Sequence, residues 1–225
     1  MTAVVQKFNK PISIIGAGDF NPEIFEYSLT IGKDLIAVDG GLNHLNPAHH
    51  FPRWIIGDLD SAKNIQIWVD KGSKLSKVSE QESTDFEKCL YSVDAPLYLA
   101  NGFLGLRLDH TLASCSALIK RKDKNVILLG KKDLIIHVDE MISLELEVGT
   151  RFSLFPLKEV LGLTSYGLKY NISGVYFSPD SIIGTSNEVT SPKVEISFKG
   201  SGMLLILPIC CLPRILKTYG VLPLI

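Results

Sequence analysis

Hydrophobic residues in the first part of the chain gather in short continuous runs, each followed closely by glycine, aspartate or asparagine. The runs occupy residues 12–15, 35–38, 54–56, 97–100 and 126–129. Runs of this length that are rich in isoleucine, leucine and valine are typical of strands buried on both faces. They therefore predict the core strands of a largely parallel sheet.

Segments of helical length lie between these runs. Thr84 is the predicted N-cap of a helix that carries Phe86 and Leu90, and a second helix is expected from His110 to about Arg121. Alternation of strands and helices predicts an α/β fold with an N-terminal doubly wound, mostly parallel sheet. Such sheets bind ligands beyond the carboxyl ends of their strands.

The hydrophobic period changes after about residue 140. Residues 142–148 and 194–198 alternate strictly between hydrophobic and polar side chains, and glycines punctuate the interval between them. This pattern predicts a smaller, all-β sandwich domain. We therefore expect an α/β domain over residues 1–140, a β-sandwich domain over 141–207 and an apolar C-terminal tail over 208–225.

Charge and composition narrow the class of protein. The 225 residues include 23 basic and 24 acidic side chains and carry a formal net charge of −1. Nucleic-acid binding requires a basic surface, so nucleic acid is not an expected partner. The N-terminus lacks the apolar stretch of a secretory signal, and prolines and charges interrupt the apolar tail, so no membrane span is expected.

The cysteine pattern indicates the redox compartment. The four cysteines form no CxxC pair, and they are Cys89, Cys115, Cys210 and Cys211. Cysteines used in this way are expected to be reduced and buried. Together with the missing signal sequence, they predict a cytoplasmic protein.

Carboxylates follow two of the predicted strands. Asp39 comes after residues 35–38, Asp58 and Asp60 come after residues 54–56, and Asp85 begins the first predicted helix. Several acids at one edge of a sheet repel one another unless a cation compensates their charge. Carboxylate oxygens suit Mg²⁺. The pattern predicts a metal site, although Gly-Asp and Asp-Ser pairs also form ordinary turns.

Basic residues near these acids narrow the chemistry. Lys88 follows Asp85 by one helical turn, and Arg107 stands close to Asp109. Arginine binds phosphate oxygens through two hydrogen bonds, so Mg²⁺ ligands beside arginine and lysine indicate a nucleoside triphosphate site. Ordinary surface ion pairs would use the same residue types. The chain has no GxxxxGK[ST] motif, so this site is not a P-loop.

Two other kinds of site can be built from the same residues. Gly16 and Gly18, with Asp39 further along, imitate a dinucleotide-binding motif, but its third glycine would fall at Asn21. The segment from Asp58 to Ser61 resembles the loop of phosphatases that use an aspartate nucleophile. The later lysine and acidic pair of those phosphatases have no clear counterpart.

Taken in order, six segments of the chain resemble the thiamine pyrophosphokinases. They are Asp39-Gly40-Gly41, Gly57-Asp58-Leu59-Asp60-Ser61, Gln81 with Thr84-Asp85-Phe86 and Lys88, Arg107-Leu108-Asp109-His110, Gly167-Leu168-Lys169-Tyr170 and Thr185-Ser186-Asn187-Glu188. Each is modest alone, but six in the same order and spacing are specific. The resemblance runs from about residue 12 to 207.

The resemblance implies one-step transfer of the diphosphoryl group of ATP to the hydroxyl of thiamine, giving thiamine diphosphate and AMP. It implies that the N-terminal domain binds ATP, that the sandwich binds thiamine, and that the enzyme is a homodimer with its active site at the interface. The implied Mg²⁺ ligands are Asp58, Asp60 and Asp85, and Arg107 joins them in catalysis. The implied ATP contacts are Asp39, Gln81, Lys88, Arg107 and Asp109, and the implied thiamine contacts are Tyr170, Ser186 and Asn187.

The chain departs from the family pattern in several places. Glu80 and Glu82 flank Gln81 where relatives often have aspartates, Leu106 stands where glycine is usual, and Tyr170 replaces a tryptophan of some relatives. Nothing in the resemblance explains the tail. An aspartate-nucleophile phosphatase and a non-catalytic module that binds nucleotide or thiamine remain alternatives.

Overall fold

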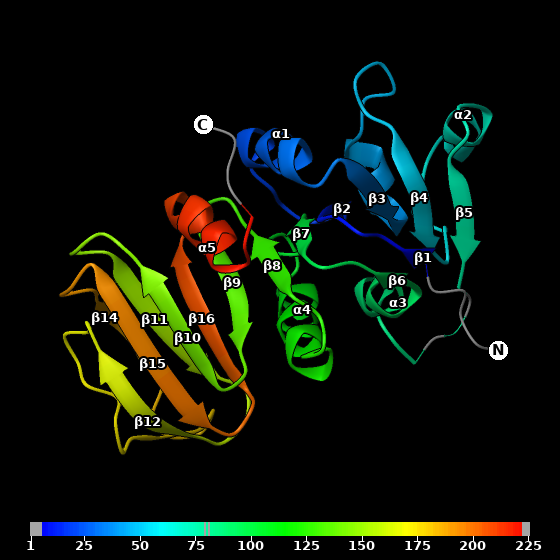
Figure 1. Cartoon of the computed structure of the whole chain (residues 1–225). Coiled ribbons are helices and arrows are strands. Elements are labelled where there is room, and N and C mark those ends of the chain that lie inside the picture. The colour runs from blue at the N-terminus through cyan, green and yellow to red at the C-terminus, as the bar shows by residue number, and fades with distance from the viewer. Residues whose placement is uncertain (1–5, 79, 81, 222–225) are drawn as a thin grey trace. The chain divides into compact units, whose positions relative to one another are not determined.

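The computed structural model describes residues 6–78, 80 and 82–221 and divides into two compact units (Figure 1). The first unit takes in the chain up to Ala117 together with Asp123–Lys131, and the second takes in Leu118–Lys122 and the chain from Lys132 onward. Among the residues described, no helix is both long and apolar enough to cross a membrane.

The first unit is built on parallel strands. One set runs in the order β3 (Asp34–Val38), β4 (Pro52–Gly57), β5 (Lys74–Lys77), and the other in the order β2 (Ile12–Ile15), β7 (Tyr98–Asn101), β8 (Val126–Leu129). Because β2 also lies beside β3, the strand order is β5-β4-β3-β2-β7-β8. The predicted parallel sheet is confirmed, and its order reverses at β2, where open parallel sheets bind ligands.

Helices and hydrophobic contacts bury both faces of this sheet. Leu35 and Ala37 of β3 share a core cluster with Phe25 of α1 (Pro22–Ile31) and Trp68 of α2 (Ile65–Asp70). Ile36, which points to the opposite face, is also fully buried. The unit is completed by a 3-10 helix, η1 (Asp39–His44), the short strands β1 (Gln6–Lys7) and β6 (Val93–Asp94), and α4 (Leu108–Lys120), which runs on into the second unit.

Helix α3 (Asp85–Ser92) begins where the sequence predicts. The Thr84 hydroxyl accepts a hydrogen bond from the Glu87 backbone N–H at 3.2 Å, and the Glu87 carboxylate accepts one from the Thr84 N–H, also at 3.2 Å. This reciprocal capping satisfies backbone donors that the first turn of a helix leaves unpaired. It fixes the first turn of α3 and therefore the position of Asp85.

We expect Thr84→Ala to lower the free energy of unfolding by about 1 kcal/mol, because alanine cannot accept the bond from Glu87. Urea denaturation followed by circular dichroism measures the change. Thr30→Ala is the matched control, since the Thr30 hydroxyl donates to the carbonyl of Tyr27 within α1 and caps no helix. Equal losses in the two variants would contradict the capping role.

The second unit contains two antiparallel sheets. One has the order β14 (Gly184–Glu188), β11 (Arg151–Pro156), β16 (Met203–Pro208), β9 (Asp133–Val138), and the other β10 (Met141–Glu145), β15 (Lys193–Lys199), β12 (Val160–Tyr166), β13 (Tyr176–Phe177). A Cβ at Gly184 would lie 3.2 Å from the Phe177 ring. Alternate residues of β15, such as Val194 and Ile196, are buried. The predicted sandwich is confirmed.

Part of the predicted tail is ordered structure. After β16 the chain forms a 3-10 helix, η2 (Ile209–Cys211), and then α5 (Leu212–Thr218), whose Leu212, Ile215 and Leu216 are buried. This part of the tail is hydrophobic because α5 packs into the second unit, where it contacts β10.

The cysteines follow the prediction with one exception. All four are free, and Cys89, Cys115 and Cys211 are buried. The expectation of burial is wrong for Cys210, which is exposed, because neighbouring residues of a 3-10 helix point in different directions from its axis.

Candidate active site

Three carboxylates meet at the carboxyl edge of the parallel sheet. Asp39 follows β3, and Asp58 and Asp60 follow β4. One oxygen of each lies within 4.8 Å of those of the other two. Because β3 and β4 are parallel neighbours, they deliver these side chains to the same edge.

The electrostatics of Asp39 indicate a place for a cation. Its Oδ1 is buried and has no hydrogen-bond partner among the described residues. Burial raises the pKa of Asp39, the backbone N–H of Gly40 lowers it, and the charges of Asp85, Asp58 and Asp60 raise it further. A bound cation would relieve this repulsion and pair the orphaned oxygen. The all-oxygen donor set fits Mg²⁺.

The backbone around these acids is held in uncommon conformations. Asp39 has φ 43° and Leu59 has φ 67°, in the left-handed region that non-glycine residues seldom adopt. A Cβ on Gly57 would lie 2.9 Å from the Cβ of Asp39, so glycine is required for β4 to end this close to Asp39. Strain of this kind is typical of functional sites.

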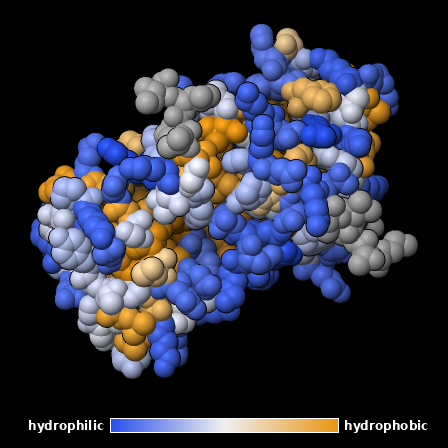
Figure 2. Space-filling view, in the orientation of Figure 1, coloured by the Kyte–Doolittle hydropathy of each residue, from blue (hydrophilic) through white to orange (hydrophobic). Residues whose placement is uncertain are grey.

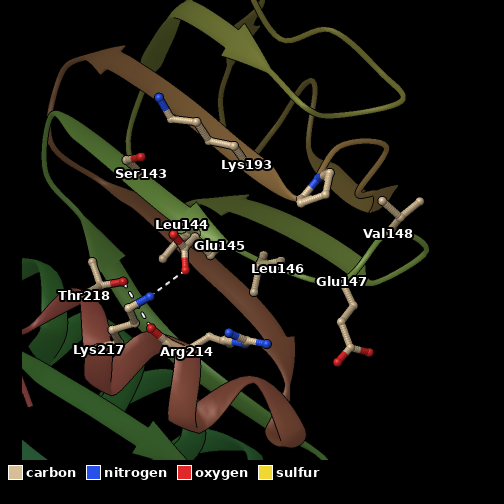
Figure 3. Close-up of a pocket in the computed structure, with 11 residues that line it drawn as sticks. Ser143, Leu144, Glu145, Leu146, Glu147, Val148, Lys193, Arg214, Lys217 and Thr218 are labelled. Atoms are coloured by element: carbon tan, nitrogen blue, oxygen red, sulfur yellow. Dashed lines mark hydrogen bonds and ion pairs between the residues drawn. The ribbon is translucent and has the colours of Figure 1, made fainter. Parts of the chain in front are cut away.

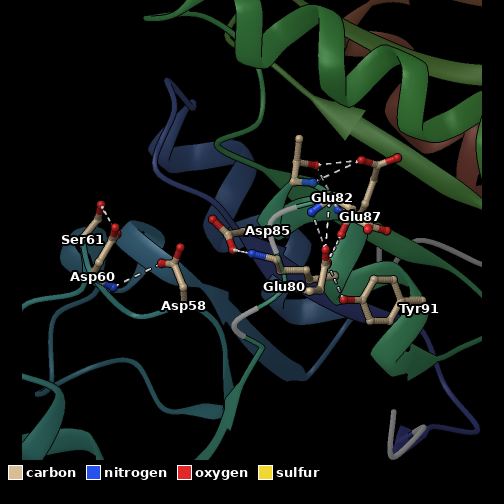
Figure 4. Close-up of polar contacts among 11 residues, drawn as sticks. Asp58, Asp60, Ser61, Glu80, Glu82, Asp85, Glu87 and Tyr91 are labelled. Atoms are coloured by element: carbon tan, nitrogen blue, oxygen red, sulfur yellow. Dashed lines mark hydrogen bonds and ion pairs between the residues drawn. The ribbon is translucent and has the colours of Figure 1, made fainter. Parts of the chain in front are cut away.

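A residue that the sequence did not single out supports the loop carrying Asp58 and Asp60. Asn43 of η1 donates to the carbonyl of Ser61 at 2.9 Å and accepts from the N–H of Lys63 at 2.8 Å. Within the loop, the Asp60 N–H donates to Asp58 Oδ1 at 3.3 Å (Figure 4). Asn43 stands 18 residues from Ser61, and no local motif indicated the contact.

Asp85 is part of a largely buried ion pair. The ammonium group of Lys88 donates to Asp85 Oδ1 at 3.1 Å, and the side chain of Lys88 is only 3% exposed. Figure 4 shows Asp85 directed toward the side of the view that holds Asp58 and Asp60. Because a buried charge is costly without a partner, Lys88 and Asp85 depend on one another.

The segment leading into α3 is organised by Glu80. Its carboxylate accepts hydrogen bonds from the Ser83 hydroxyl, from the N–H groups of Glu82 and Ser83, and from the Tyr91 hydroxyl (Figure 4). These donors, Ser83 foremost, lower the pKa of Glu80 to about 2. Gln81, the predicted ATP contact in this segment, lies outside the described residues.

Arg107 and Asp109 form an exposed pair of their own. The guanidinium donates from Nη2 to Asp109 Oδ2 at 2.6 Å and from Nε to Oδ1 at 3.2 Å. The hydrogen bonds between the two side chains lower the pKa of Asp109 and raise the pKa of Arg107. Leu106, which precedes this pair, has φ 53°, in the left-handed region that glycine adopts easily. The loop therefore keeps the conformation expected for the glycine that the resemblance places at this position.

The predicted thiamine residues cluster in the second unit. The Asn187 amide donates to the Tyr170 carbonyl at 2.7 Å and accepts from the Tyr170 N–H at 3.0 Å. Asn187 is buried, whereas Tyr170 is 61% exposed. Ser186 has φ 62° and donates its N–H to the Ser153 hydroxyl at 3.1 Å. The geometry thus presents the Tyr170 ring and the Ser186 side chain on the surface.

The glycines that imitate a dinucleotide motif have a packing role. A Cβ on Gly16 or Gly18 would lie 2.6 Å or 2.8 Å from the carbonyl oxygen of Gly102. Their lack of side chains lets the loop after β2 approach the loop after β7. This close packing accounts for the two glycines, and no dinucleotide site is needed to explain them.

Sequence comparisons decide the family. Residues 29–129 match the model of the thiamin pyrophosphokinase catalytic domain, and residues 135–204 match that of the thiamin pyrophosphokinase vitamin B1 binding domain. The chain belongs to the thiamin pyrophosphokinase family. Thiamin pyrophosphokinase 1 of Caenorhabditis elegans is 31% identical over 189 residues, 75% of this chain and 76% of that protein. Thiamine pyrophosphokinase 2 of Oryza sativa is 31% identical over 200 residues, which cover 74% of this chain and 75% of that protein.

Solved structures agree on the fold of this thiamin pyrophosphokinase family member. The thiamin pyrophosphokinase of Candida albicans superposes with a TM-score of 0.76 at 16% identity, covering 92% of this chain and 94% of that one. The yeast thiamin pyrophosphokinase superposes with a TM-score of 0.75 at 17% identity, covering 92% of this chain and 92% of that one. Diphosphoryl transfer from ATP to thiamine is the reaction of this family, and the aspartate-phosphatase alternative is wrong.

Proposed function

We propose that this protein transfers the diphosphoryl group of ATP to the hydroxyl of thiamine, giving thiamine diphosphate and AMP. The observation that carries the proposal is that one chain contains matches to both the catalytic and the vitamin B1 binding domains. The carboxylates of Asp39, Asp58 and Asp60, gathered at the sheet edge where such folds bind ligands, support it.

Asp58, Asp60 and Asp85 are the proposed Mg²⁺ ligands. Asp39, whose carboxylate lies in one cluster with Asp58 and Asp60, is proposed to offer a further oxygen. When bound, Mg²⁺ neutralises charge on the phosphate oxygens and helps to orient them. Lys88 acts by holding Asp85, because its ammonium group is buried against that carboxylate. This makes Lys88 a positioning residue for the ATP site.

Arg107 and Asp109 are proposed to bind ATP, together with Gln81. Both members of the pair are about two-thirds exposed, so a phosphate can replace Asp109 on the guanidinium without opening a buried contact. Arginine matches phosphate oxygens through two parallel hydrogen bonds. Arg107 is thereby available to stabilise the charge of the transferring group.

Tyr170 and Ser186 are proposed to contact thiamine, and Asn187 to position Tyr170. A tyrosine ring attracts the fixed positive charge of the thiazolium. We expect Asn187→Ala to raise the KM for thiamine at least about tenfold while kcat and the KM for ATP change little, because Asn187 holds the backbone of Tyr170 and thereby the position of its ring. Asn171→Ala is the control, since the Asn171 amide accepts a local hydrogen bond from the N–H of Ser173. A kcat effect alone would contradict this role.

A homodimer with the active site at its interface is also proposed. Large hydrophobic side chains on the sandwich are exposed, among them Leu163, Tyr166 and Tyr176. Orange patches are visible on this unit, at the lower left of Figure 2. Exposed apolar patches often mark protein interfaces. Light scattering after gel filtration is expected to give twice the chain mass, and a fully active monomer would contradict the proposal.

A cytoplasmic location is proposed as well. The four free cysteines, three of them buried, support a reducing compartment. Microscopy of the full chain with a fluorescent tag tests this location.

The reaction itself is tested by incubating the protein with ATP, Mg²⁺ and thiamine and separating the products by chromatography. AMP and thiamine diphosphate in equal amounts are expected. Thiamine or nucleotide binding without AMP would instead indicate the non-catalytic module.

A further inference from the structure

A groove of about 630 Å³ lies within the second unit. Residues of β10 and the loop after it form one wall, together with Pro192 and Lys193, the first residue of β15, and α5 closes the other side (Figure 3). Among the residues that the structure describes, no candidate ATP, metal or thiamine residue lines it. Its volume is in the range of sites that hold small organic molecules, about 300–1,000 Å³.

The floor and rim of the groove are partly apolar. Leu144 and Leu146 line it and are buried, whereas Val148, at its rim, is 61% exposed. Pro192 adds a further apolar surface. Because Leu144 and Leu146 are already covered, a ligand that fills this space would place its apolar body on Val148 and Pro192.

Three cations line the groove, and they differ in their partners. Lys217 pairs with Glu145 at 2.6 Å, and Lys193 pairs with Glu195 at 2.9 Å. In the described part of the chain, the guanidinium of Arg214 has no hydrogen bond or ion pair. Figure 3 shows its side chain extended below Leu146.

The acidic groups leave Arg214 available. Glu145 is already held by Lys217, which is the main reason that the pKa of Glu145 is lowered, and Arg214 adds only a weaker electrostatic effect. Glu147 also lines the groove, but Figure 3 shows its carboxylate directed away from Leu144. A guanidinium offers a planar set of donors that matches carboxylate, sulfonate or phosphate oxygens.

We propose that this groove binds a small organic anion, with its apolar body against Val148 and Pro192 and its acidic group on Arg214. Arg214 belongs to α5, which follows the region matched by the vitamin B1 binding domain, residues 135–204. The site therefore combines residues of that domain, from β10 to Val148 and at the start of β15, with a segment that follows it. It does not depend on the proposed reaction.

The test uses two fluorescent probes with the full-length protein. One is 8-anilinonaphthalene-1-sulfonate, and the other is N-phenyl-1-naphthylamine, which has the same apolar body without the acid. Arg214→Gln is expected to raise the Kd of the sulfonate probe at least about tenfold, because a charge-assisted hydrogen bond is lost. The Kd of the neutral probe should stay within twofold. Val148→Asp should weaken binding of both probes.

Lys199→Gln is the matched control, because it removes an exposed cation of β15 that does not line the groove. It should leave both Kd values unchanged. The proposal is overturned if the wild-type protein does not bind the sulfonate probe, if Arg214→Gln binds it as well as wild type does, or if Lys199→Gln weakens it equally. Unchanged circular dichroism spectra establish that each variant is folded.

Discussion

Asp58→Asn is expected to abolish AMP formation from ATP and thiamine while the protein stays folded. Asparagine keeps the shape of the side chain and an oxygen that can accept the hydrogen bond from the Asp60 N–H. It removes one of the charges in the cluster with Asp39 and Asp60, and so weakens the binding of Mg²⁺. We expect a loss of at least about a thousandfold in rate, equivalent to about 4 kcal/mol of transition-state stabilisation.

The same substitution should not destabilise the fold. The charge of Asp58 raises the pKa of Asp39, so removing it relieves repulsion in the metal-free protein. Rates are measured by chromatography of AMP over a range of Mg²⁺ concentrations, and stability by urea denaturation. Asp70→Asn, at an exposed aspartate bonded to Gln66 on α2, is the control and should retain full activity. Wild-type rates in Asp58→Asn would rule out its role in binding Mg²⁺.

Features determined by nearest neighbours in the chain were predictable from the sequence. The parallel strands were recognisable as continuous hydrophobic runs, because strands covered on both faces are hydrophobic throughout, as at β3 and β8. The start of α3 was predictable because Thr84 and Glu87 cap it from positions three residues apart. The alternation of β15 likewise follows from one buried and one exposed face.

Features that depend on contacts between distant segments could not be predicted in the same way. The spacing of Asp85 and Lys88 predicts a shared helix face, but the burial of Lys88 depends on how α3 packs. Asn43 and Gly57 matter only because η1 and the end of β4 come together in space. The family motif suggests that Asn187 contacts a ligand, yet its amide is occupied by the backbone of Tyr170.

Asp85→Asn is expected to abolish activity and, unlike Asp58→Asn, to destabilise the protein. It leaves the ammonium group of Lys88, whose side chain is 3% exposed, without a carboxylate. Breaking a buried ion pair costs about 3–5 kcal/mol. We expect about 2 kcal/mol here, because Asp85 itself is partly exposed. A loss of activity in this variant could therefore come either from the loss of a Mg²⁺ ligand or from the loss of stability.

The double variant Asp85→Asn/Lys88→Met separates the two effects. Methionine fills the space of the lysine stem without its charge, and replacing both members of a buried pair is often neutral. We expect the free energy of unfolding to return to within about 1 kcal/mol of wild type, while AMP formation stays at least about a thousandfold below it. Urea denaturation and AMP chromatography measure the two quantities. If recovered stability also restored activity, Asp85 would serve only to compensate Lys88, and its role in the ATP site would be refuted. If stability did not recover, the ion pair would not be the source of the instability in Asp85→Asn.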